Sequence, residues 1–99
     1  MGTKNNPGTF DCYANADPDE PMFVLLARDP TAHLVVTFWR ALRAEMGETS
    51  EAKLEEAREC SLAMERWAKD HGKHSPAALE AMRRVLARSA PSLEKAEER

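Results

Sequence analysis

The helical signal is strongest between residues 30 and 71, which read PTAHLVVTFWRALRAEMGETSEAKLEEARECSLAMERWAKDH. In the first part of this stretch, apolar residues recur every three or four positions, the spacing that places side chains on one face of an α-helix. Gly47 follows at a position where helices commonly end. The spacing therefore predicts a helix over residues 30–46. Its apolar stripe consists of Leu34, Val35, Phe38, Trp39, Leu42 and Met46.

A second helix is predicted over residues 50–71, which are rich in the helix-favouring residues Ala, Glu, Lys and Arg. Its apolar seam is narrower, and Gly72 marks its end in the same way as Gly47. Because the link between the two helices is short, we expect an antiparallel helical hairpin. The seam consists of Leu54, Ala57, Cys60, Met64 and Trp67.

Two further helices are predicted on either side of the hairpin. Residues 76–89 follow a Ser-Pro start and are ended by Pro91. Residues 21–28 hold an apolar run that could form a buried strand or a short helix. Because no other strand-like segment is available to pair with it, we predict a helix there. The expected fold is all-α, a small bundle of three main helices preceded by a short one.

The length of 99 residues allows one domain. We expect a single helical domain over residues 10–91, between a flexible N-terminal arm (residues 1–9) and a charged C-terminal tail (residues 92–99). A chain this short buries only a modest share of its surface, and its stability margin is thin. We therefore expect it to self-associate as a homo-oligomer.

The charge balance argues against general binding to nucleic acid. The chain carries 14 basic and 17 acidic residues, a net charge of −3, whereas proteins that grip phosphates show a basic field. Acidic residues concentrate between positions 11 and 29, and basic residues between positions 66 and 88. No apolar run approaches a membrane span, and the first residues lack a signal-peptide core. We expect a cytoplasmic protein without membrane contact.

The chain lacks the motifs of the common catalytic and cofactor sites, namely a glycine-rich phosphate loop, H-E-x-x-H, C-x-x-C and G-x-S-x-G. We therefore predict no enzyme activity, no cofactor and no metal ligands. A metal site at His71 and His74 with Cys60 can be imagined, but histidines at a helix C-terminus already interact favourably with the helix dipole. His33 stands alone beside the apolar stripe and has no obvious nucleophile to activate.

The best candidates for binding a partner or an anion are five basic residues. Arg84 and Arg88 stand four positions apart on one helix face, where two like charges cost stability unless an anion or a partner lies there. The alternative is a solvated face that the acidic N-terminal segment balances. The full cluster is Arg84, Arg88, Arg83, Arg66 and Lys69.

Aromatic and apolar residues form a second set of candidates. The stripe over residues 30–46 is wide, so a small bundle can leave one side of it uncovered for self-association or a partner. Aromatic rings there could also stack on a ligand. The candidate interface or stacking residues are Tyr13, Trp39, Val35 and Met46.

Residues 11–30, DCYANADPDEPMFVLLARDP, resemble a block found in small, uncharacterised phage and prophage proteins. Those proteins share a head of the form D-x-Y-x-x-A-x-P-D-E-P-x-F-V-L-L-A-R-D, followed by a helix with a Trp and an Ala/Glu-rich helix. Trp39 and residues 51–67 fit that outline. The resemblance implies an accessory protein of a phage or mobile element that acts inside a bacterial host cell. It assigns no catalytic residues.

Three hypotheses follow. The first is a binding protein that inhibits a host protein, such as a component of a defence system, by surface contact. The second is an oligomeric sponge that sequesters an anionic nucleotide through the Arg84 and Arg88 pair and stacking aromatic rings. An enzyme with an unrecognised site ranks below both.

Overall fold

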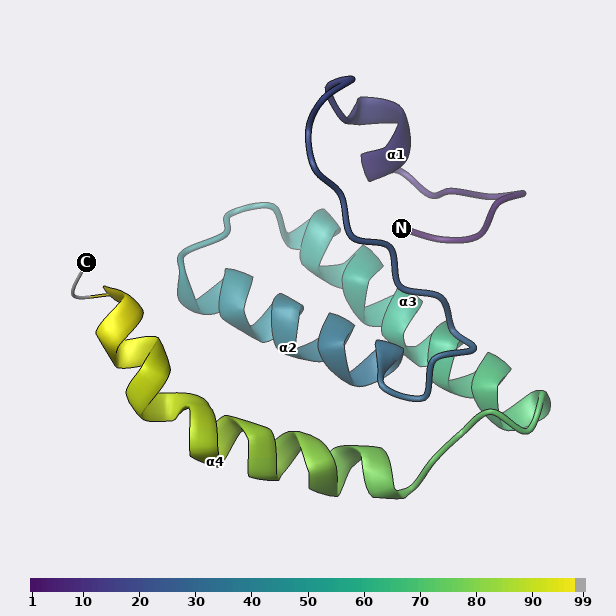
Figure 1. The fold of residues 1–99 in the computed structure, drawn as a ribbon. Helices are drawn as coiled ribbons and strands as arrows, with labels where there is room; N and C mark the ends of the chain where they lie inside the picture. The colour runs from purple at the N-terminus through teal and green to yellow at the C-terminus, as the bar shows by residue number, and fades with distance from the viewer. Residues whose placement is uncertain (98–99) are drawn as a thin grey trace.

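The computed structural model describes the backbone of residues 1–97 and the side chains of residues 1–88. The fold is a small all-helical bundle with no strand among these residues, which confirms the predicted fold class (Figure 1). Two of the predicted helices begin and end within about two residues of the expected positions. The helices are α1 (Cys12–Asn15), α2 (Ala32–Glu45), α3 (Glu51–Asp70) and α4 (Ala77–Glu97).

Helices α2 and α3 form the predicted antiparallel hairpin and are the pair with the most extensive packing (Figure 1). The Ser50 hydroxyl accepts a hydrogen bond of 3.2 Å from Lys53 N and so caps the start of α3. Gly47 and Gly72 follow α2 and α3 with φ angles of 90° and 66°, in the left-handed region that glycine tolerates best. Both glycines were predicted to end these helices.

The core of the hairpin is built from small side chains. Ala57, Ser61 and Ala68 lie on one face of α3, and Ala32 and His33 begin α2; all five are buried. Small residues at a helix contact let the two backbones approach closely. Among the described side chains, no large one is fully buried. The described part of the chain therefore has a small core.

Helix α4 differs from the prediction in length. The expected end at residue 89 was wrong, because α4 continues through Pro91 to Glu97. Proline removes one helical hydrogen bond and bends a helix, but the remaining turns of the helix can still form. Figure 1 accordingly shows the axis of α4 changing direction in its C-terminal part.

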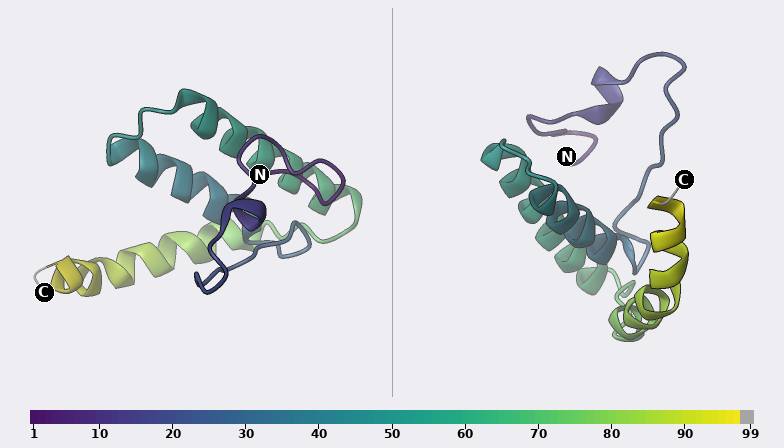
Figure 2. Two further views of the ribbon diagram at one scale, coloured as in Figure 1. Left: turned by 90° about the horizontal axis from the view of Figure 1, so that it is seen from above. Right: turned by 90° about the vertical axis from the view of Figure 1, so that its left-hand side faces the viewer.

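Helix α4 also packs less than expected. Three of its apolar side chains, Leu79, Val85 and Leu86, are exposed by 38–50%. Few close contacts join α4 to the other helices, and both views in Figure 2 show it diverging from the hairpin toward its C-terminal end. The radius of gyration is 14.9 Å, above the about 13 Å typical of a compact domain of this length.

The predicted helix over residues 21–28 was also wrong: the segment is extended and ends in a turn. Asp29 N donates a 2.9 Å hydrogen bond to Leu26 O, which reverses the chain just before α2. Two prolines, Pro21 and Pro30, leave little room for a helix, and so short a helix is costly to nucleate. The N-terminal helix is instead α1, where the Asp11 carboxylate accepts from Ala14 N.

Candidate functional site

The predicted basic cluster is divided between two helices, and all five of its side chains are exposed. On α4, both Arg83 and Arg84 lie within 3.9 Å of the Glu80 carboxylate, one turn earlier. Such exposed pairs are weak. Among the described side chains, no carboxylate pairs with the other three members, nor does the acidic segment over residues 11–29 pair with any of the five. The other members are Arg88 on α4 and Arg66 and Lys69 on α3.

The predicted interface residues lie on two elements. Tyr13 is on α1 and 77% exposed, whereas Val35 and Met46 are exposed on α2 and Trp39 is half-buried beside them. Val35 and Trp39 therefore share one face of α2, Met46 directly follows that helix, and Tyr13 lies on a separate helix.

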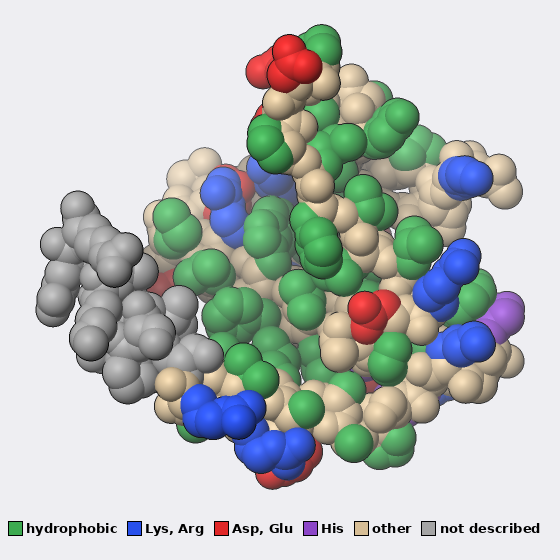
Figure 3. Space-filling view, viewed as in Figure 1, with side chains coloured by type: hydrophobic (Ala, Val, Ile, Leu, Met, Phe, Trp, Pro, Cys, Tyr) green, Lys and Arg blue, Asp and Glu red, His purple; other side chains and the backbone are tan. Residues whose placement is uncertain are grey.

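A larger set of exposed apolar residues surrounds the α2 candidates. On α2 they follow one another at steps of three and four, so they form one stripe along the helix. The extended segment before α2 adds four more, including Phe23, which is 86% exposed. Figure 3 shows hydrophobic side chains gathered over α2 and this segment. We call this set the apolar surface: Met22, Phe23, Val24, Leu26, Val35, Phe38, Leu42 and Met46.

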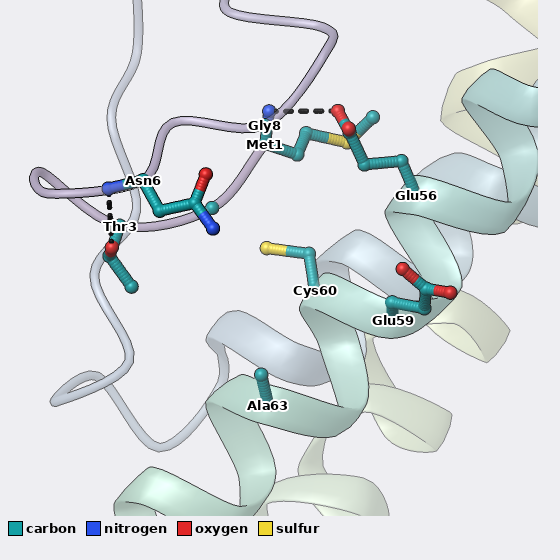
Figure 4. Close-up of a pocket in the computed structure, with 9 residues that line it drawn as sticks. Met1, Thr3, Asn6, Gly8, Glu56, Glu59, Cys60 and Ala63 are labelled. Atoms are coloured by element: carbon teal, nitrogen blue, oxygen red, sulfur yellow. Dashed lines mark hydrogen bonds and ion pairs between the residues drawn. The ribbon is translucent and has the colours of Figure 1, made fainter.

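The N-terminal residues lie over α3 and, together with it, line an open surface pocket of about 340 Å³. Glu56 of α3 accepts hydrogen bonds from Thr9 N at 2.6 Å and from Phe10 N at 2.9 Å, and its carboxylate lies 3.1 Å from the amino group of Met1 (Figure 4). Burial raises the pKa of the Glu56 carboxyl, but these three donors outweigh it and hold the pKa below its usual range. Glu56 therefore fastens residues 1–10 to the hairpin.

Cys60 lies in the wall of the same pocket (Figure 4). Burial raises the pKa of the Cys60 thiol above its ordinary value, which keeps it in the less reactive thiol form. Glu56 and Glu59 give the wall an acidic character. Because the Met1 amino group pairs with Glu56, Glu59 is the remaining charged group in the pocket wall.

A second, smaller cavity lies where α2, α3 and the loop before α4 meet. Its volume is about 160 Å³, and its wall includes His33, Glu65 and His74. His33 Nε2 lies 3.4 Å from Glu65 Oε2, and the rings of His33 and His74 stack with their centres 5.9 Å apart. Neither histidine was predicted to lie near the other.

Local spacing could not have joined these three side chains, which come from three separate segments. His71, the neighbour considered with His74, instead stacks on Trp67 with the ring centres 3.8 Å apart, and its Nδ1 lies 2.8 Å from Trp67 O. One signal was present in the sequence: His33 lies in the first turn of α2, and the facing helix α3 carries the Glu65 carboxylate. That position becomes informative only once the hairpin register is known.

Comparisons with protein-family models, with curated proteins and with solved structures found no match. In the part of the chain that the structure describes, no helix has the length and apolar character needed to cross a membrane.

Proposed function

We propose that this chain acts by binding another protein through its apolar surface, as an accessory protein of a phage or mobile element that inhibits a host protein. The observation that carries the proposal is that large apolar side chains stand outside the core along α2 and the segment before it. Exposed apolar patches of this kind are typical of interaction sites.

The total surface of the chain supports the same proposal. A folded monomer of 11.1 kDa has an accessible surface of about 5,700 Å². This chain exposes 8016 Å². The difference is roughly 2,300 Å², more than the about 800 Å² that one partner buries in a standard interface. The surface is large enough to cover a partner protein, a second copy of the chain, or both.

The resemblance to phage and prophage proteins bears on the kind of partner. Its most specific part, residues 11–30, includes the extended segment that carries Phe23 and Val24. Their side chains are 86% and 67% exposed, so they contribute little to the core of this chain. Most side chains of residues 11–30 lie outside the core, as expected for a segment that contacts another molecule. Inside a bacterial cell, a host protein such as a defence component fits that role.

Affinity capture from host lysate tests the proposal. The double variant Phe23→Asp/Val24→Asp should keep the fold, because both side chains are exposed, and should lose the partner that the wild-type chain retains. Thr49→Asp, an exposed polar position in the hairpin link, serves as the matched control and should retain it. The captured protein is then purified and assayed with added chain, which should inhibit it. A partner held equally well by the double variant, or unaffected in its activity, would contradict the proposal.

A second candidate function is an oligomeric sponge for an anionic nucleotide. The observation in its favour is that Arg84 and Arg88 share one exposed face of α4, where only the Glu80 carboxylate lies within ion-pair range of Arg84 among the described side chains. Guanidinium groups suit phosphate, and an exposed ring such as Tyr13 suits a base.

Thermal unfolding in the presence of cyclic and linear nucleotides separates the two functions. A sponge should melt at a higher temperature with one of these ligands, because only the folded protein binds it. Arg84→Glu/Arg88→Glu should remove the shift while leaving the melting temperature without ligand close to the wild-type value. If no nucleotide changes the melting temperature, the sponge is excluded. Light scattering of the same samples gives the number of chains in the assembly.

A further inference from the structure

Three side chains of the kinds that bind metal ions converge where α4 begins. His33 comes from the first turn of α2, Glu65 from α3, and His74 from the loop before α4. One ligand atom from each lies within 4.8 Å of the other two, and no other such group occurs among the described residues. His33 is only 8% exposed, so its imidazole is held in place by the hairpin.

We propose that His33, Glu65 and His74 bind one divalent transition-metal ion of the zinc class. In a tetrahedral site with Zn–N and Zn–O bonds of about 2.0–2.1 Å, ligand atoms stand roughly 3.4 Å apart. The distance of 3.4 Å between His33 Nε2 and Glu65 Oε2 already matches that edge. A side-chain rotation of His74, which is half-buried in a loop, completes the triangle.

The cavity and the donor atoms define the class of ion. The cavity of about 160 Å³ holds the ion together with a water molecule as fourth ligand. Two imidazoles and one carboxylate favour zinc and its first-row neighbours over Mg²⁺ and Ca²⁺, which prefer oxygen ligands alone. The site would therefore be four-coordinate with one exchangeable position.

The position of the site lets a bound ion connect the start of α4 to the hairpin. Helix α4 has few close contacts with the hairpin, and its first residues follow directly after His74. An ion held by His33, Glu65 and His74 ties that loop to both helices of the hairpin. Because the three ligands come together only in the folded chain, binding stabilises the folded state.

The test uses the full chain without a histidine tag, stripped with a chelator and titrated with Zn²⁺. We expect one Zn²⁺ per chain by calorimetry, a higher melting temperature with Zn²⁺ than with Mg²⁺, and visible absorption of a tetrahedral site when Co²⁺ replaces Zn²⁺. Loss of a group that only orients a metal ligand costs tenfold or more in affinity. His74→Ala and Glu65→Gln should therefore each weaken Zn²⁺ binding by more than about tenfold.

His71→Ala is the matched control, since His71 is the remaining histidine and lies outside the cluster. It should keep both the affinity for Zn²⁺ and the shift in melting temperature. Because His33 is buried and its replacement by Ala endangers folding, the test relies on the variants of His74 and Glu65. Absence of Zn²⁺ binding to the wild-type chain, or unchanged affinity in His74→Ala, would overturn the proposal. Either result leaves the proposed protein-binding function untouched.

Discussion

The Ser61 hydroxyl of α3 donates a 2.8 Å hydrogen bond to the main-chain oxygen of His33 in α2. Thr37 Oγ1 lies 2.9 Å from the same oxygen and 2.7 Å from Ser61 Oγ, so three polar groups meet inside the hairpin. This network, buried at Ser61, fixes how α2 lies along α3. It also sets the position of the His33 imidazole toward Glu65.

Replacing Ser61 by Ala should lower the free energy of unfolding by about 1 kcal/mol, the usual net value of one hydrogen bond. The loss stays small because Thr37 still reaches the His33 oxygen. Urea denaturation followed by circular dichroism measures it. Thr49→Ala, which removes an exposed hydroxyl, is the control and should change little. Equal stability of Ser61→Ala and the wild-type chain would show that the network does not hold the hairpin.

Enlarging a small core residue should destabilise the hairpin. Ala57 is fully buried in the contact between α2 and α3, so Ala57→Leu forces the helices apart and should cost roughly 1–3 kcal/mol. Ala52→Leu places the same side chain on an exposed position of the same helix and should be nearly neutral. The comparison uses the same urea denaturation. Equal stability of the two variants would contradict close packing of α2 against α3 at Ala57.

The end of α3 should depend on glycine at position 72. Gly72 has φ of 66° and no atom within 4 Å of the place a Cβ would occupy, so only backbone strain opposes a side chain there. Gly72→Ala should lower stability by about 1–2 kcal/mol. Gly72→Asn should cost less, because Asn tolerates the left-handed region. Thermal unfolding of both variants and of the wild-type chain measures these differences. A melting temperature of Gly72→Ala above that of the wild-type chain would contradict the observed φ.

Glu48 should make the hairpin link sensitive to acid. The Arg43 guanidinium, 3.0 Å away, and Ser50 N hold the pKa of the Glu48 carboxyl below its usual range. A carboxyl whose pKa is lower in the folded state contributes stability above its unfolded-state pKa of about 4.3 and loses it as the pH falls further. Glu48→Gln should therefore unfold at a lower temperature than the wild-type chain at neutral pH. The difference in melting temperature between the two chains should vanish in acid. A difference that does not change with pH would contradict the ion pair.

Local sequence signals predicted the hairpin, whereas features that depend on contacts between distant segments were not predicted. Helical spacing and the two glycines lie within a few residues of the structure they determine, so α2 and α3 were found nearly to the residue. Residues 21–28 were misassigned because an apolar run does not specify whether it will find a surface to bury itself against. The extension of α4 beyond Pro91 was missed because a single proline can bend a helix as well as end it.

The candidate sites show the same division. Arg84 and Arg88 could be placed on one face from their spacing alone, and both are exposed on α4. The meeting of His33, Glu65 and His74 depends on the register of α2 against α3 and on the course of the loop after α3. Nothing in the spacing of these residues along the chain encodes that register. The exposure of the apolar surface likewise follows from how little of α2 the other helices cover.

Amide hydrogen exchange of residues 22–26 tests most directly whether the apolar surface contacts another protein. In the dilute isolated chain these amides should exchange within the fastest class, because the segment is extended and none of its N–H groups donates to another main-chain group. In the complex with the captured partner they should exchange at least about tenfold more slowly. Equally fast exchange in the complex would contradict the account.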